Sequence, residues 1–159
     1  MTEEFPYNLP IWRRTHSAES PDKKIMAEIN PAYEVSMGNP TYGNLILSNG
    51  LNINDCNPSF IWSDNSKYLA VAQYTTNWLG GIGKQRLLIV DIHQQLSWQS
   101  AKLGYYIQPE TFENEKLTIT VNPFKNPKTI TYKIPHDLDM FTKIKLPPNN
   151  TLGPIGDKE

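Results

Sequence analysis

The stretch that decides the fold runs from residue 57 to residue 93 and reads NPSFIWSDNSKYLAVAQYTTNWLGGIGKQRLLIVDIH. β-Branched and aromatic residues, which are typical of strands, fill three segments of it. They predict strands at Ser59–Trp62, Lys67–Thr76 and Gln85–Ile92. The turn residues Ser63-Asp64-Asn65-Ser66 separate the first two segments, and a glycine-rich loop separates the last two. The sequence therefore predicts a β-meander around which the rest of the chain is arranged.

The pattern of this stretch recurs along the chain at a regular spacing. Ser20-Pro-Asp-Lys-Lys-Ile-Met-Ala-Glu-Ile can be laid over Ser63-Asp-Asn-Ser-Lys-Tyr-Leu-Ala-Val-Ala, 43 residues further on. Leu45-Ile-Leu-Ser-Asn matches Leu87-Leu-Ile-Val-Asp at a spacing of 42 residues. A third copy has its middle strand in residues 114–121 and its last strand in residues 128–134. A period of about 40–45 residues with several strands in each unit is the range of propeller blades.

The repeated unit is a turn carrying Ser-Pro-Asp or Ser-Asp-Asn, a strand ending in Met-Ala or Leu-Ala, a loop, and a strand such as Leu-Leu-Ile-Val-Asp-Ile. In these features residues 20–134 resemble the blades of β-propellers of the WD40 and TolB-like kinds. The chain departs from that pattern because it has no Gly-His and no Trp-Asp pair, and its turns carry Lys23 and Ser66 in place of glycine. About three copies are too few to close a propeller. We therefore expect an all-β fold with little helix, in which antiparallel sheets form an open barrel, a sandwich or a partial propeller.

The flanking segments complete a single β-rich domain over residues 1–147. Residues 1–19 are predicted to form an extended N-terminal arm, with apolar residues at Phe5, Tyr7, Leu9 and Ile11. Residues 20–134 hold the blade-like repeats. Met140–Leu146 offers one last strand, which is expected to pair with the edge left by the arm. Residues 148–159 are predicted to be a flexible C-terminal tail.

Composition narrows the classes of partner. The 159 residues carry a formal net charge of −1, whereas nucleic-acid proteins usually carry a basic surplus. One cysteine excludes an intrachain disulfide, which fits a reducing compartment. Neither a secretory signal nor an apolar segment long enough to cross a bilayer is recognisable. We expect a cytoplasmic protein with no nucleic-acid partner and no membrane partner.

The sequence shows no pattern of metal-ligating or nucleophilic residues. The three histidines, His16, His93 and His136, have no carboxylate or thiol at ligand spacing. We therefore expect no metal and no cofactor. The lone Cys56 is interpreted as a small packing residue rather than as a nucleophile.

Two other patterns have structural interpretations. Gly80-Gly81-Ile82-Gly83-Lys84 lies between two predicted strands and lacks the spacing of a phosphate loop, so it reads as a hairpin loop. Asp22, Asp64 and Asp91 stand at corresponding places in the copies. Carboxylates at such places usually accept hydrogen bonds from the amides of their own turn.

The remaining candidate site is the aromatic and polar loop beside these glycines. Its predicted partner-binding residues are Tyr74, Thr76, Asn77, Trp78 and Leu79. A Trp-Leu pair in a loop is costly to expose unless it packs back or meets a partner, so both a loop folded onto its own sheet and a contact patch stay open. A second aromatic group, Trp98, Tyr105 and Tyr106, is assigned to the core.

These features favour a binding protein without catalysis over an enzyme. In size, polarity and lack of catalytic residues the chain resembles the immunity proteins that bacteria make against contact-delivered toxins. That resemblance implies a protein partner, a cognate toxin domain, whose active site the chain would occlude. One alternative is a small hydrolase whose acid and base are carboxylates such as Asp64 and Asp91. Another is a carbohydrate-binding module that stacks Trp and Tyr on sugar rings.

Overall fold

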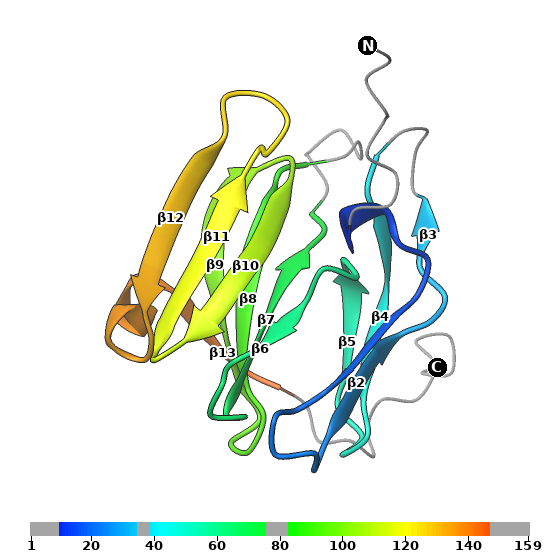
Figure 1. The fold of residues 1–159 in the computed structure, drawn as a ribbon, viewed down its shortest axis with the longest axis vertical. Helices are drawn as coiled ribbons and strands as arrows, with labels where there is room; N and C mark the ends of the chain where they lie inside the picture. The colour runs from blue at the N-terminus through cyan, green and yellow to red at the C-terminus, as the bar shows by residue number, and fades with distance from the viewer. Residues whose placement is uncertain (1–9, 35–38, 76–82, 147–159) are drawn as a thin grey trace, which may run out of the picture.

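The structure, a computed structural model, describes residues 10–34, 39–75 and 83–146 (Figure 1). Within these ranges it contains thirteen β-strands, two short 3-10 helices and no α-helix. The paired strands are antiparallel and form a ten-stranded and a three-stranded sheet, without closing into a barrel or a propeller. The expectation of an all-β fold with little helix, built from antiparallel sheets, is confirmed.

The first unit is a four-stranded meander in which each strand pairs with the next. Its strands are β1 (His16–Glu19), β2 (Met26–Ile29), β4 (Thr41–Leu47) and β5 (Asn52–Cys56). The short β3 (Tyr33–Glu34) pairs with the start of β4. The 3-10 helix η1 (Pro10–Trp12) precedes β1 and buries Ile11. β1 lies within the range predicted as the arm.

The second unit repeats this meander, and the third keeps three of its strands. The second consists of β6 (Ile61–Trp62), β7 (Tyr68–Gln73), β8 (Gln85–Asp91) and β9 (Leu96–Gly104). The third is a separate sheet of β10 (Ile107–Glu113), β11 (Lys116–Val121) and β12 (Lys128–Lys133). The strands predicted in the stretch from residue 57 to residue 93 are thus present as β6, β7 and β8, each shorter than predicted.

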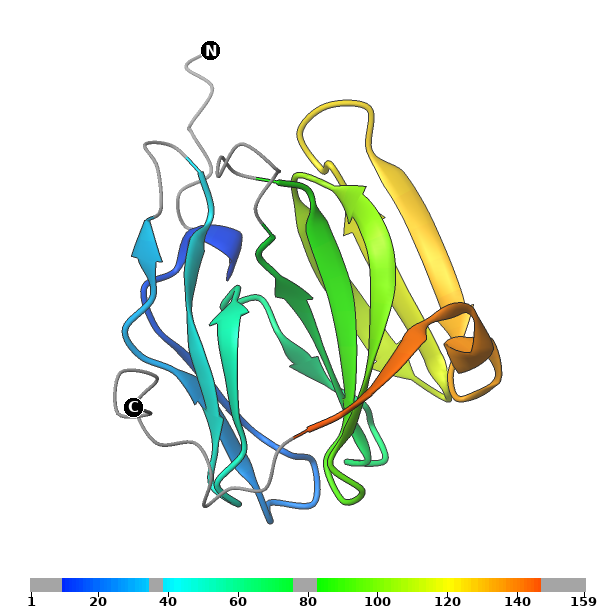
Figure 2. The same cartoon turned by 180° about the vertical axis from the view of Figure 1, so that it is seen from behind.

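The chain then returns to the second unit. After η2 (His136–Met140), the last strand β13 (Thr142–Lys145) pairs with β9, as Figure 2 shows from behind. The prediction that this strand pairs with the edge left by the arm is wrong. The strand of the arm, β1, lies at the opposite edge of the ten-stranded sheet from β13. Only Phe141 separates η2 from β13, so this strand pairs with the edge beside which η2 ends, that of β9.

The turns confirm that the first two units are equivalent. The Ser20 hydroxyl donates to Asp22 Oδ1 (2.6 Å) and accepts from the amide of Ile25 (3.1 Å). The Ser63 hydroxyl donates to Asn65 Oδ1 (2.6 Å) and accepts from the amide of Tyr68 (2.9 Å). Serine and Asx side chains thus replace backbone partners in the same way in both turns.

The next turn position is also equivalent in these two units and differs in the third. Lys23 and Ser66 both adopt a positive φ, of 61° and 63°. These are the positions at which the propeller-type turn carries glycine, so both residues accept the left-handed conformation that glycine would adopt more easily. The third unit instead turns at Asn114 and Glu115, with φ of 51° and 62°, as in a two-residue hairpin loop.

The three units stack face to face, with an apolar core in each of the two layers between them. β7 shows the arrangement: Leu69 and Val71 belong to the core shared with the first unit, and Ala70 and Ala72 to the core shared with the third. Between β5 of the first unit and β7 of the second, the strand pairing consists of one residue pair, Cys56 with Gln73. Because both faces of β7 are covered, its sequence Tyr-Leu-Ala-Val-Ala reads as a continuous apolar run instead of alternating.

Candidate functional site

Four aromatic side chains gather at the end of the molecule where β9 leads into β10. Trp12 of η1 lies 5.1 Å from Phe124 and 6.2 Å from Tyr106, measured between ring centroids. Tyr105 and Phe124 are 52% and 44% exposed. We call Trp12, Tyr105, Tyr106 and Phe124 the aromatic end. It brings η1, which precedes the first unit, into contact with loops of the third unit. Grouped, exposed aromatic residues are the usual anchors of protein interfaces.

A shallow pocket of about 310 Å³ opens at the aromatic end. Its lining residues are Tyr105, Tyr106, Asn122, Phe124 and Lys125. The aromatic faces can pack against an apolar or ring-shaped group, while the amide and the ammonium group can fix its orientation through hydrogen bonds. The lining of this pocket can therefore bind and orient a ligand.

A buried amide holds Trp12 in place. Asn57 is fully buried, and its Nδ2 donates to the carbonyl oxygens of Ile11 (2.9 Å) and Thr41 (2.8 Å). Its Oδ1 accepts from the amide of Ser59 (3.1 Å). One side chain therefore ties η1 to the start of β4 and to the link before β6. The indole of Trp12 therefore belongs to a segment, η1, that the three hydrogen bonds of Asn57 connect to two other parts of the chain.

Close backbone packing places the other aromatic residues. A Cβ on Gly104 would lie 2.5 Å from Val121 Cγ1 and 2.9 Å from Asn122 Oδ1. Only glycine allows the end of β9 to approach the end of β11 so closely. The amide of Asn122 then donates to the carbonyl of Tyr106 (2.8 Å), which joins the two loops that carry the exposed rings.

A second buried amide connects all three units beneath this end. Gln85 is fully buried; its Nε2 donates to the hydroxyl of Tyr42 (2.5 Å) and its Oε1 accepts from the amide of Ile107 (2.6 Å). Burial raises the pKa of Tyr42 to about 12. The ring of Tyr74 lies 5.0 Å from that of Tyr42. The polar network thus gives the aromatic end a rigid base.

Of the predicted partner-binding residues, only Tyr74 lies among the described residues. It is half-buried, packs on Tyr42 and donates its amide to the carbonyl of Asp55 (2.8 Å). Thr76, Asn77, Trp78 and Leu79 lie outside the described residues. The two ends of that segment are joined, because the amide of Gly83 donates to the carbonyl of Thr75 (2.8 Å).

The assignment of the second aromatic group to the core is wrong for Tyr105. Trp98 is half-buried against the second core, and Tyr106 is half-buried within the aromatic end. Tyr105 follows the last residue of β9, where the inward and outward alternation of a strand no longer applies. Phe124 was not singled out from the sequence. An aromatic residue inside the turn-rich segment Asn-Pro-Phe-Lys-Asn-Pro was the signal for it.

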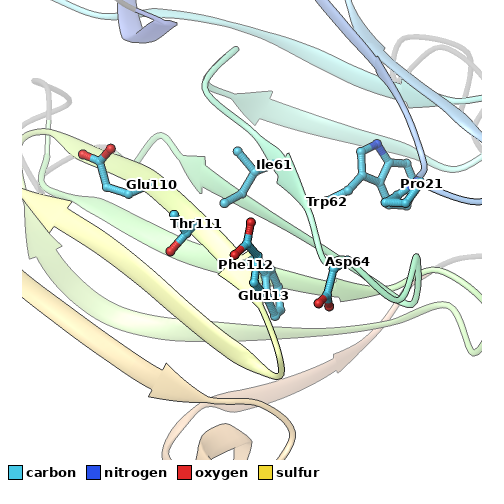
Figure 3. A pocket seen from close by; sticks show the side chains of 8 residues that line it. All are labelled: Pro21, Ile61, Trp62, Asp64, Glu110, Thr111, Phe112 and Glu113. Carbon is cyan, nitrogen blue, oxygen red and sulfur yellow. The ribbon is translucent and has the colours of Figure 1, made fainter.

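A groove of about 320 Å³ lies between the edges of β6 and β10 (Figure 3). Ile61, Trp62 and Phe112 supply apolar walls, and three carboxylates, Asp64, Glu110 and Glu113, are exposed around it. Asp64 is partly engaged, because its Oδ2 accepts from the amide of Asn114 (2.9 Å). The hydrolase alternative named Asp64 together with Asp91, and Asp91 does not line this groove.

Asp22 and Asp91 accept hydrogen bonds from amides of their own turns, as expected, whereas Asp64 accepts one from Asn114 in the turn of the third unit. Asp91 is buried, and its Oδ1 accepts from the amides of His93 (3.1 Å) and Gln94 (3.0 Å). The counterpart of Asp22 is Asn65, and Asp64 stands one position earlier. The prediction that Asp22 and Asp64 are equivalent is therefore wrong by one residue.

Neither the histidines nor Cys56 line the pocket at the aromatic end or the groove between β6 and β10. His16 packs 4.5 Å from the ring of Phe60, and burial, followed by the charge of Arg13, lowers its pKa. His93 and His136 are exposed. Cys56 is fully buried in the first core, and burial raises the pKa of its thiol, as suits a packing residue. Within the described ranges, no three His, Cys, Asp or Glu side chains are grouped as metal ligands.

Comparison of the chain with models of protein families, with curated proteins and with solved structures found no match. Over the residues described, no helix has the length and hydropathy needed to span a membrane.

Proposed function

We propose that this protein is a non-catalytic, protein-binding protein that docks a partner through the aromatic end. The observation that carries the proposal is the exposure of Tyr105 and Phe124 on a base fixed by two buried amides. Exposed aromatic rings lose apolar hydration when covered, and side chains that are already ordered lose little entropy on binding.

The finer proposal is an immunity protein, whose partner is a bacterial toxin domain and whose action is to occlude the active site of that toxin. A rigid all-β scaffold with recognition chemistry at one end suits such a task, because occlusion requires tight and preorganised contact but no reaction. Tyr74 follows β7 and packs on Tyr42, which belongs to the polar network beneath the aromatic end. Thr76, Asn77, Trp78 and Leu79, which lie outside the described residues, come next in the sequence. Tyr74 and these residues are proposed as further partner-binding residues.

The test compares a variant of the aromatic end with a matched control. Tyr105→Ser/Phe124→Ser removes both exposed rings, and Met140→Ser removes an apolar side chain that is 67% exposed on η2. The tagged wild type is used to isolate a partner from its native host, and the partner is then purified and tested for toxicity in co-expression. We expect the wild type and Met140→Ser to restore growth. The double variant should bind at least about 30-fold more weakly, as for the loss of hot-spot residues.

Equal affinity of the double variant and the wild type would remove the aromatic end from the interface. A partner that binds but is not toxic would contradict the immunity proposal and leave protein binding intact. An unchanged thermal transition in the double variant is required in either case, because it separates loss of contact from loss of fold.

The pocket at the aromatic end also favours a second candidate, a carbohydrate-binding module. Tyr105, Tyr106 and Phe124 offer ring faces beside the amide of Asn122, which is the combination that sugar rings require. Titration with a panel of soluble oligosaccharides, followed by tyrosine fluorescence, decides between the two. Saturable quenching that Tyr105→Ser abolishes would support the carbohydrate module.

A further inference from the structure

A second pocket, of about 370 Å³, lies where the second unit faces the end of β5. It is lined by Asp55, Gln73, Tyr74, Thr75, Arg86 and Lys102. Two of these residues are cations and one is a carboxylate, so the lining carries a net charge of +1. Polar and charged side chains predominate in this lining, unlike in the aromatic end or in the groove between β6 and β10.

The two cations are placed against each other. Arg86 on β8 and Lys102 on β9 are directly opposite in the strand register. Like charges at such positions repel, because the Cβ atoms are only about 5 Å apart. Among the described residues the one ion pair joins His136 and Asp137, so neither cation has a carboxylate within salt-bridge distance, and Asp55 pairs with neither.

A relay of side-chain amides holds the guanidinium in this position. Arg86 Nη1 donates to Gln99 Oε1 (3.3 Å), and Gln99 Nε2 donates to Gln73 Oε1 (3.2 Å). Gln73 Nε2 in turn donates to the backbone carbonyl of Asn54 (3.2 Å). The relay fixes the orientation of each amide, so that an oxygen faces Arg86.

The charge of Arg86 is nevertheless not compensated. Within residues 10–34, 39–75 and 83–146, the side chain of Arg86 has one hydrogen-bond partner, the neutral amide of Gln99, and its Nε is buried without a partner. Leaving a buried donor of a charged group without a partner is unfavourable. Arg86 and Lys102 are therefore adjacent like charges, and Asp55, the one carboxylate of the lining, forms an ion pair with neither of them. An anionic ligand between the two cations would relieve their repulsion.

We propose that this pocket binds one oxyanion group, a carboxylate or a phosphate, between Arg86 and Lys102. A single such group neutralises the net charge of the lining, and the planar fork of Arg86 matches both chemistries. Asp55 on the side of the first unit repels further negative charge, which restricts the ligand to one anionic group. This site does not depend on the proposed protein partner.

The test titrates the full chain near neutral pH with sodium phosphate in one arm and sodium acetate in the other. Sodium chloride keeps the ionic strength constant, since screening alone alters surface charge interactions. The readouts are the NMR resonance of Arg86 Nε–H and the melting temperature. We expect saturation in the millimolar range with at least one anion and a melting temperature that rises with its concentration. The arm that saturates identifies the ligand chemistry.

Three variants make the result specific. Arg86→Gln and Lys102→Gln should each weaken the response at least tenfold. Lys102→Gln should also raise the melting temperature without anion, because it removes the like-charge repulsion from an exposed side chain. The control Lys143→Gln, on exposed β13, should respond like the wild type.

Two results would overturn the proposal. One is a wild-type response that does not saturate in either arm. The other is an equal response in Lys102→Gln and Lys143→Gln, which would reduce the effect to unspecific attraction by surface lysines. If Arg86→Gln fails to fold, the comparison of Lys102→Gln with Lys143→Gln tests the proposal by itself.

Discussion

Replacing Asn57 by alanine should destabilise the protein more than any exposed substitution. The variant loses two donated hydrogen bonds, to the carbonyls of Ile11 and Thr41, and one that is accepted from Ser59. At about 1–1.5 kcal/mol for each, with the partners left buried, the free energy of unfolding should fall by about 3–5 kcal/mol. The loss should be accompanied by loosening of η1, because Asn57 is the side chain that binds the Ile11 carbonyl among the described residues.

Urea denaturation followed by tryptophan fluorescence measures this loss, and the slope with denaturant should stay unchanged. Fluorescence of the native variant should also shift, since Trp12 leaves Tyr106 and Phe124. Asn54→Ala is the matched control, because Asn54 is exposed and the relay to Gln73 uses only its backbone carbonyl. If the free energy of unfolding of Asn57→Ala falls by less than about 1 kcal/mol, the claim that the Asn57 amide holds η1 and β4 together is refuted.

Three further predictions concern the turns, the packing and the pH dependence. Ser20→Ala and Ser63→Ala should each cost about 1–2 kcal/mol by urea denaturation, because each removes the acceptor of a turn amide; clearly unequal losses would argue against equivalent turns. Gly104→Ala should cost about 1–3 kcal/mol, because its Cβ would meet Val121, and Val121→Ala in the same chain should restore part of the loss. Stability should decline by about 2–3 kcal/mol as the pH rises from about 10 to 12, because Tyr42 ionises earlier in the unfolded chain than when buried. Tyr42→Phe should flatten that decline in urea midpoints, and an equally steep decline would contradict the assignment.

The repeat was predictable because its signal is local. The turn residues Ser20 and Ser63 bind partners two and five positions away, so each turn is stabilised by residues that are close in the sequence. The strands that follow were predictable for the same reason. The one-residue error between Asp64 and Asn65 came from matching aspartate to aspartate, although the 43-residue spacing that places Ser63 on Ser20 also places Asn65 on Asp22.

Contacts between distant segments could not be read in this way. The Asn57 side chain reaches residues 46 and 16 positions away, and β13 pairs with β9 across the whole third unit. The aromatic end brings residue 12 into contact with aromatic residues between positions 105 and 124, and no pattern in the sequence indicates that contact. The pairing of Arg86 with Lys102 likewise depends on the register of two strands, which shifts at irregularities on both sides of Arg86.

The faces at the two ends of the stack limit how this architecture can grow. Glu19 and Glu28 are exposed on the first unit, and Thr129, Thr131 and Lys133 on the third, whereas the middle unit is apolar on both sides. A further copy appended to either terminus would have to bury these polar groups without partners, at a cost that a small domain does not tolerate. Only a unit inserted between the present outer units would leave both of these faces in water.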